Sequence, residues 1–289
     1  MYDVSTKLDF QENFNGWFIP QKQNQYDVYQ DGKLITVFDE TNQDSIQDSI
    51  LELGLNNIAS ESLDTFYNYK NRPEYRLGKH FEIPADIEDA ITLYETFLTG
   101  TMLAKRSTHT KVCPNDTDMR LVDKVLNWLK NTDFYIAPSS TIYHDSYVSG
   151  LLFHTLNVLQ NIYDLLKLNK FKDVNVVDAT CVALVHDWCK IGLYTPYKRN
   201  IKNEETGQWE QVDSFRRNTP AIPMGHGVES VYKAMKVFQL SEAEFAAIRW
   251  HMGAWNVAHA ELNDLQAANE KYPLVHLLQF ADQLAIVKY

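Results

Sequence analysis

A short apolar run that ends in a His-Asp pair constrains this chain most. Residues 178–184 read Asp-Ala-Thr-Cys-Val-Ala-Leu, which predicts a buried helix, and His186-Asp187 follows it almost at once. Gly192 then predicts the stop of the helix. Because neighbouring side chains on a helix point about 100° apart, His186 and Asp187 can reach one ion only at a helix end or a crowded helix junction. We therefore expect the pair where a buried helix opens into a cleft.

An imidazole beside a carboxylate suits a divalent transition metal such as Mn, Fe, Co, Ni or Zn. A His-Asp pair alone is a weak signal, because it occurs often by chance. Its weight comes from histidines and an aspartate at the ends of other expected helices. These are His154, His226, His251 and Asp282.

Length and composition fit an ordinary globular protein. The 289 residues suffice for one large domain or two ordinary ones. No apolar run approaches the length of a bilayer span, and no basic segment followed by an apolar one opens the chain. The three cysteines, Cys113, Cys181 and Cys189, form no CxxC pair, and an odd number argues against a disulfide framework. We expect a cytoplasmic protein with reduced cysteines and no membrane partner, and Cys189 as a packing residue.

The charge balance restricts the partners. A formal net charge of −11 disfavours a broad basic surface, so we expect no duplex nucleic acid partner. It does not exclude a small anionic substrate, because a bound metal can reverse the local potential.

Residues 1–110 are expected to form a smaller α+β region of unknown role. Residues 25–30 and 33–40 flank Asp31-Gly32, which is a strong two-residue hairpin signal, and residues 17–19 can add a strand. A short helix is expected over residues 45–55. A longer helix is expected from Pro84 to about Leu103. The polar, aperiodic stretch 105–114 is the expected boundary.

Residues 111–289 are expected to form a mainly α domain. Leu121, Val125 and Trp128 are predicted to share the apolar face of the first helix, and Asp173 is predicted to cap the central one. A turn near Glu205 predicts a β-hairpin inserted at about 194–223. The helices are expected at 115–131, 150–168, 173–187, 226–238, 241–251 and 272–288.

Five local motifs in a fixed order carry a family resemblance. They are Gly150-Leu151-Leu152-Phe153-His154-Thr155, His186-Asp187-Trp188-Cys189-Lys190, Gly225-His226-Gly227-Val228-Glu229-Ser230, Trp250-His251-Met252-Gly253 and Phe280-Ala281-Asp282. Over roughly residues 115–289 the chain resembles the HD-domain metal-dependent phosphohydrolase superfamily. It is similar to bacterial and phage members with an inserted hairpin, and also to the HD domain of certain bacterial 3′→5′ exoribonucleases. The resemblance implies an HD-domain helical bundle.

The resemblance also implies one or two divalent ions (Mn, Fe, Co, Ni, Zn or Mg). The first would be held by His154, His186, Asp187 and Asp282. Asp187 would bridge to a second ion that His226 and His251 also bind. Two ions sharing a hydroxide make a nucleophile at neutral pH and clamp an in-line phosphoryl displacement. The alternative is one ion, with His226 and His251 contacting the substrate.

Lys190 follows Asp187 by three residues, so it can face the same cleft. We expect Asp187 and Lys190 to act in catalysis, with Lys190 contacting the substrate and neutralising a phosphate oxygen. A solvated cation at a helix end is the alternative for Lys190. His144 and Asp145 precede the first ligand helix. A contact of His144 with the substrate, or support of a ligand, competes there with a purely structural loop role.

The base of the hairpin is expected to supply the remaining substrate contacts, Tyr194, Arg216 and Arg217. A turn centred on Glu205 would place Arg216 opposite Tyr194, a few residues from Lys190. Guanidinium groups bind phosphate in a bidentate way. A solvated hairpin of mixed charge is the alternative.

Three tryptophans flank the expected ligands. Trp188, Trp250 and Trp255 can form a wall for base stacking, although we expect at least two of them in the core.

The expected function is hydrolysis of a phosphoester or phosphoanhydride in a small phosphorylated substrate, foremost a nucleotide, through a metal-activated hydroxide. A 3′→5′ exonuclease on short single strands is an alternative, and the acidic charge counts against it. A catalytically silent protein that binds a nucleotide or a partner is another. The complete ligand set counts against that alternative.

Overall fold

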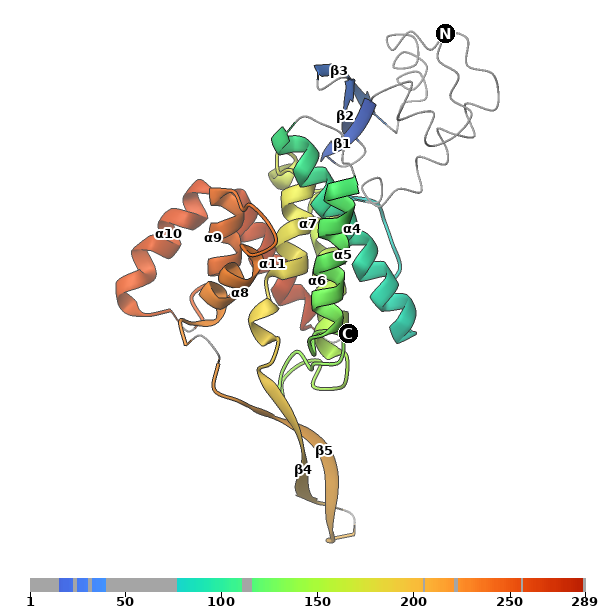
Figure 1. Cartoon of the computed structure of the whole chain (residues 1–289). Coiled ribbons are helices and arrows are strands. Elements are labelled where there is room, and N and C mark those ends of the chain that lie inside the picture. The colour runs from blue at the N-terminus through green and yellow to red at the C-terminus, as the bar shows by residue number, and fades with distance from the viewer. Residues whose placement is uncertain are drawn as a thin grey trace. The chain divides into compact units, whose positions relative to one another are not determined.

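The computed structural model of the chain describes residues 16–22, 25–30, 33–39, 77–110, 116–204, 206–220, 223–255 and 257–287. Helices predominate in these ranges, so the expectation of a mainly α structure is confirmed (Figure 1). No helix among the described residues is both long and apolar enough to cross a membrane. The helix expected over residues 45–55 lies outside the described residues.

The first described strands form an antiparallel sheet in the order β1-β2-β3. They are β1 (Gly16–Lys22), β2 (Gln25–Gln30) and β3 (Lys33–Asp39). Gln30 pairs with Lys33, so the predicted two-residue hairpin connection is confirmed.

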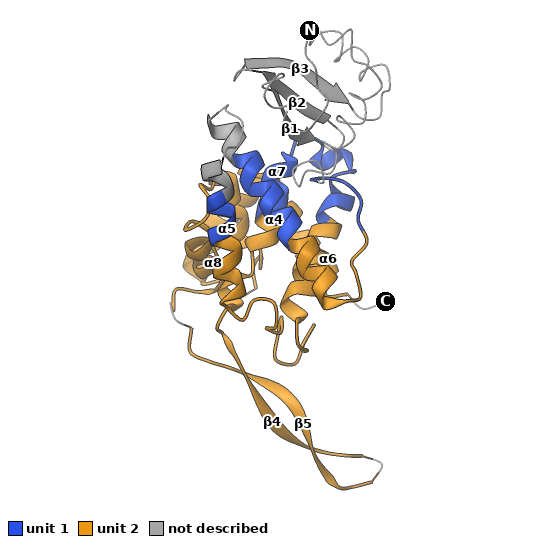
Figure 2. Cartoon of the chain, turned by 45° about the vertical axis from the view of Figure 1, so that its right-hand side comes forward, with its two compact units in different colours: residues 1–81, 95–124, 162–181 blue, residues 82–94, 125–161, 182–289 orange. Residues whose placement is uncertain are grey.

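The chain divides into two compact units, which Figure 2 colours separately. Unit 1 comprises residues 1–81, 95–124 and 162–181, and unit 2 comprises residues 82–94, 125–161 and 182–289. Neither unit ends at residue 110, the boundary expected from the sequence. The helices that contribute residues to both units are α4 (Ile87–Thr110), α5 (Asp116–Lys130), α6 (Gly150–Leu165) and α7 (Val176–Val185).

Helix α4 differs from its prediction at both ends. It begins at Ile87 rather than at Pro84, and Asp86 accepts the backbone N–H of Glu88 at 2.9 Å. It continues to Thr110, so residues 105–110 are helical and not the aperiodic loop expected there.

Aromatic packing holds the helical segments of unit 1 together. The rings of Phe81 and Phe97 lie 4.8 Å apart, and each also packs against Tyr163 of α6. The Tyr163 hydroxyl lies 2.9 Å from the Thr180 hydroxyl of α7, so these buried polar groups satisfy each other.

In unit 2, Tyr94 anchors the turn that carries the His-Asp pair. Its hydroxyl donates to the Leu184 carbonyl at 3.1 Å and accepts the Trp188 indole N–H at 3.1 Å. Trp188 is fully buried and lies edge-on to Trp128. Trp188 therefore belongs to the core. Trp250 is half-buried and Trp255 is exposed, so the expectation that at least two of the three tryptophans lie in the core is wrong.

The buried face of α5 is one residue off the predicted one. Val122, Val125 and Leu129 are buried, whereas Leu121 and Trp128 are exposed. The apolar spacing is helical, as predicted, but α5 carries two neighbouring apolar stripes, and the one that includes Val122 and Leu129 is buried.

The cap of α7 also differs from its prediction. The Asn175 side-chain oxygen accepts the backbone N–H groups of Val177 and Asp178, at 2.7 and 3.2 Å. Asn175, not Asp173, therefore satisfies the first turn of the helix. Helix α7 ends at Val185, and the short 3-10 turn η3 (Trp188–Lys190) follows.

The inserted hairpin consists of β4 (Tyr194–Lys202) and β5 (Trp209–Arg217), as predicted, and extends away from α8 and α9 (Figure 1). Its register differs by one residue, because Tyr194 pairs with Arg217 and not with Arg216. The Asn203 N–H donates to the Gln208 carbonyl and the Gly207 N–H to the Asn203 carbonyl, so the turn is centred after residue 205. A shift of one residue turns each side chain to the opposite face.

The last helices of unit 2 are α8 (His226–Ala234), α9 (Glu242–Trp250), α10 (Leu262–Lys271) and α11 (Pro273–Ala285). Ser241 caps α9 as predicted, and Glu244 completes a capping box. Helix α10 was not predicted. A Cβ on Gly227 would lie 2.2 Å from the Arg249 carbonyl oxygen, so glycine allows α8 to approach α9 closely.

Candidate metal centre

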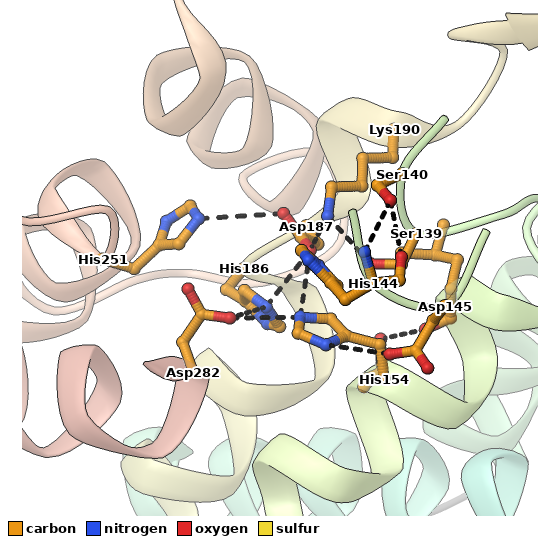
Figure 3. A network of polar contacts seen from close by, with 12 residues as sticks. Ser139, Ser140, His144, Asp145, His154, His186, Asp187, Lys190, His251 and Asp282 are labelled. Carbon is orange, nitrogen blue, oxygen red and sulfur yellow. Dashed lines mark hydrogen bonds and ion pairs between the residues drawn. The ribbon is translucent and has the colours of Figure 1, made fainter. Parts of the chain in front are cut away.

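The predicted ligands meet inside unit 2, although they come from distant parts of the chain (Figure 3). His154 lies on α6 and Asp282 on α11, while His186 and Asp187 follow α7. Each of these four side chains is at most 15 % exposed. The first residue of α8, His226, and the residue after α9, His251, complete the group.

Asp187 stands between two sets of histidines. Its Oδ2 atom lies 3.4 Å from Nε2 of both His154 and His186. Its Oδ1 atom lies 2.7 Å from Nε2 of His226 and 3.7 Å from Nε2 of His251. A carboxylate whose two oxygens face separate sets of nitrogen donors can bridge two ions.

Asp282 faces the first of these sets. Its Oδ1 atom lies 3.1 Å from His154 Nε2 and 3.8 Å from His186 Nε2. The donor atoms of His154, His186 and Asp282 all lie within 4.8 Å of one another, so these three residues can hold one cation.

The tautomers of two histidines leave lone pairs directed at the centre. His186 Nδ1 lies 2.8 Å from the Ala183 carbonyl, and His251 Nδ1 lies 2.7 Å from the Ile248 carbonyl. A carbonyl only accepts, so Nδ1 carries the proton and Nε2 is the free acceptor of the neutral ring. Among the described residues, Nε2 of His154, His186 and His251 is buried without a hydrogen-bond donor. A cation would satisfy these atoms.

The charges around His154 and Asp187 favour either a proton on His154 or a bound cation in its place. Burial opposes the charged imidazolium of His154, but Asp187 and Asp282 outweigh it and raise the pKa of His154 to about 9. Burial likewise opposes ionisation of Asp187, but Lys190 and His186 hold the pKa of that carboxyl well below its usual range. Without an ion, His154 is therefore protonated at neutral pH between ionised carboxylates. A bound cation would replace that proton.

Lys190 is part of the centre. Its Nζ atom lies 2.6 Å from Asp187 Oδ2 and donates to the Ser139 hydroxyl at 3.0 Å. The backbone N–H of Lys190 donates to the Asp187 carbonyl, so the η3 turn returns the side chain to the carboxylate. Since Lys190 is only 7 % exposed, the alternative of a solvated helix-end cation is wrong.

The loop before α6 brings His144 and Asp145 to the opposite side of the centre from His251 (Figure 3). The His144 and His154 ring centres lie 5.0 Å apart, and Asp145 Oδ2 lies 3.8 Å from His154 Nδ1. Burial, together with the charges of His154 and Lys190, lowers the pKa of His144 to about 4. His144 is thus neutral at physiological pH and can exchange a hydrogen bond with a ligand.

Ser140 shapes this loop. Its hydroxyl accepts the backbone N–H groups of Tyr143 and His144, each at 3.0 Å, and donates to the His144 carbonyl at 2.6 Å. A Cβ on Gly150 would overlap the Asp145 carbonyl oxygen, so the loop closes against the start of α6 only with glycine there. Hydrogen bonds and close packing therefore fix the loop in a conformation that holds His144 and Asp145 beside His154.

Cys189 is a candidate donor that the sequence analysis treated as packing. Its Sγ atom lies 3.2 Å from His226 Nδ1, and Asp187, Cys189 and His226 form a second group with donor atoms within 4.8 Å of one another. Burial and the Asp187 charge raise the pKa of the Cys189 thiol, so without a cation it stays protonated and packs on the His226 ring. Its position two residues after Asp187 was the available sequence signal.

The structure separates the three predicted contacts at the base of the hairpin. The Tyr194 hydroxyl donates to the Ser139 carbonyl at 3.4 Å, which places it beside the loop that contacts Lys190. Arg217 lines a pocket that also includes His226, and Arg216 is not among the described residues that line it. The expected pairing of Arg216 with Tyr194 is wrong, because the turn is centred after residue 205.

Comparisons with models of protein families, with curated proteins and with solved structures found no match.

Proposed function

We propose that this chain is a metal-dependent phosphohydrolase of the HD-domain type, acting on a nucleotide or another small phosphorylated substrate. The placement of Asp187 carries the proposal. One of its oxygens faces His154 and His186, the other faces His226 and His251, and Lys190 contacts the first oxygen. That arrangement places two sets of metal donors beside the Lys190 ammonium, which is suited to binding a phosphate.

The donor set fits a divalent cation. Histidine nitrogens and carboxylate oxygens are ligands for Mn, Fe, Co, Ni and Zn, and a thiol within reach would favour the softer ions among them. When bound, such ions lower the pKa of water and polarise a phosphoryl group.

The residues of the chain supply binding and orientation. Asp187 would fix the spacing of the two donor sets, because its carboxylate lies between them. Lys190, held by Asp187 and Ser139, would stabilise charge that develops on a phosphate oxygen. His144 would orient the substrate as a neutral imidazole, because its pKa lies at about 4.

Metal analysis of the purified protein is the first test. Release of phosphate or of nucleoside monophosphate from a panel of nucleotides and sugar phosphates would follow, with Mn²⁺, Co²⁺, Ni²⁺, Fe²⁺, Zn²⁺ or Mg²⁺. We expect at least one divalent ion to bind and to support turnover. Nucleotide binding without product under every ion would favour the catalytically silent alternative. A protein that binds neither ion nor substrate would contradict the proposal.

A further inference from the structure

A pocket of about 560 Å³ adjoins the metal centre. It includes His226, whose Nε2 atom lies 2.7 Å from Asp187 Oδ1, so a ligand that fills the pocket contacts a residue of the centre. Its volume is in the range of sites that enclose a small organic molecule. The lining residues used below are Arg217, Met224, Arg249, Met252, Trp255 and Glu261.

Three large apolar side chains of the pocket lining are exposed to water. Trp255 is 78 % exposed, Met224 62 % and Met252 38 %. An indole and two thioethers around one pocket provide a flat and adaptable surface for an aromatic ring. Of the three tryptophans considered as a stacking wall, Trp188 is core, and the Arg249 guanidinium covers the Trp250 ring at 3.9 Å. Trp255 is therefore the indole with a free face.

Two charged residues of the lining pair with each other. Arg249 Nη2 lies 2.6 Å from Glu261 Oε1, so the guanidinium is neutralised as well as stacked on Trp250. The second carboxylate oxygen of Glu261 can accept an N–H from a ligand. A flat apolar group and a carboxylate acceptor in the lining of one pocket suit a planar heterocycle with N–H groups at its edge.

We infer that this pocket binds the nucleobase of a phosphorylated substrate, with Trp255 stacking on the base and the phosphate directed past His226 to the metal centre. The orientation of the phosphate rests on the proposed function. The stacking rests only on the pocket. Every nucleobase has a π-face that an indole can cover, whereas a sugar phosphate leaves Trp255 in water.

Calorimetric binding of adenosine, guanosine, cytidine and uridine, and of their 5′-monophosphates, tests the inference, with ribose 5-phosphate as the ligand without a base. Trp255→Ala is the test variant. Trp209→Ala is the matched control, because Trp209 is 71 % exposed on β5 and is not among the residues that line the pocket. We expect at least one nucleoside to bind, and Trp255→Ala to weaken it roughly tenfold, the scale of one lost base stack. Trp209→Ala should bind it like wild type.

The outcomes separate the two proposals. Equal nucleoside affinity in Trp255→Ala and wild type, or no nucleoside binding at all, overturns the base pocket, even if phosphate is released from ribose 5-phosphate with Mn²⁺. Nucleoside binding that depends on Trp255, without cleavage of any phosphoester under any ion, supports the pocket and contradicts the hydrolase. Because Trp255 is exposed, its variant should melt like wild type, which removes misfolding as an explanation.

Discussion

The ammonium of Lys190 lies 2.6 Å from the carboxylate of Asp187, and both side chains are buried. Taking two charges out of water costs several kcal/mol per ion, so a buried pair is weak evidence for a stabilising role. The pair is one turn apart and lies among histidines with unsatisfied nitrogens. Its position fits the proposed binding of an ion and a phosphate better than a role in stability.

Asp187→Asn should abolish metal binding and activity, because it removes the charge that both donor sets share. Replacing partners of metal ligands costs roughly 10- to 100-fold, and loss of the shared ligand should cost at least as much. The variant should also lose about 3 kcal/mol of stability or more, since Lys190 stays buried without its partner. Metal content and thermal melting check both effects. Asp213→Asn is the control, because that carboxylate is exposed and pairs with Lys198 on the hairpin.

The Lys190→Met variant should separate the contribution of the Lys190 charge to activity from that of its aliphatic packing. Methionine keeps much of the aliphatic stem and removes the cation, so kcat should fall roughly 100-fold or more. The metal should remain, since a positive charge beside Asp187 opposes a bound cation. Steady-state kinetics with metal analysis measure both. Lys198→Met changes an exposed lysine and should leave kcat unaltered. An unchanged kcat in Lys190→Met would remove Lys190 from the mechanism.

The grouping of the candidate ligands was predictable from the ordered motifs and from the residue types at helix ends. His154, His186 and Asp187 are buried polar residues, Asp282 is half-buried, and all four lie in stretches of apolar sequence. The β2–β3 hairpin was predictable for a similar reason, since Asp-Gly selects a two-residue turn.

The remainder depends on contacts that a local pattern does not encode. The register of β4 and β5 depends on hydrogen bonds within the turn, such as that from Gly207 to Asn203. The placement of Cys189 beside His226 depends on packing between η3 and α8. Which tryptophan lies in the core depends on Tyr94, far away in the sequence, whose hydroxyl accepts the Trp188 indole N–H.

His226→Ala and His251→Ala test how many ions bind. Both histidines face Asp187 Oδ1, while His154, His186 and Asp282 form the other set. If two ions bind, each variant should lose about half of the metal and keep the other ion. Metal-to-protein ratios check this. An unchanged ratio with weaker substrate binding would favour one ion, with the two histidines contacting the substrate.

Metal uptake should depend on the proton of His154. The pKa of His154 is raised to about 9 from its ordinary value of 6.5, because Asp187 and Asp282 outweigh burial. In metal-free protein, protonated His154 contributes to the free energy of unfolding. This contribution is fully present below pH 6.5 and is lost as the pH rises through about 9. The melting temperature of the metal-free protein should therefore fall over that range.

Metal affinity should increase over the same range, because the ion displaces fewer protons at higher pH. Melting curves with and without Mn²⁺ at several pH values measure both trends. His154→Gln should remove them, and the exposed His259→Gln should not. An affinity for Mn²⁺ that does not change with pH would exclude His154 as a ligand that must lose a proton.

The hairpin register predicts different effects for two neighbouring arginines. Arg217 pairs with Tyr194 and lines the pocket beside His226, whereas Arg216 pairs with Thr195 and projects from the other face. Arg217→Ala should raise KM or lower kcat/KM roughly tenfold, the scale of one lost charge-assisted contact. Arg216→Ala should change neither, and both variants should keep the metal content and melting temperature of wild type. Equal effects of the two substitutions would show that the net charge of the hairpin matters rather than one contact. Loss of activity only in Arg216→Ala would contradict the register.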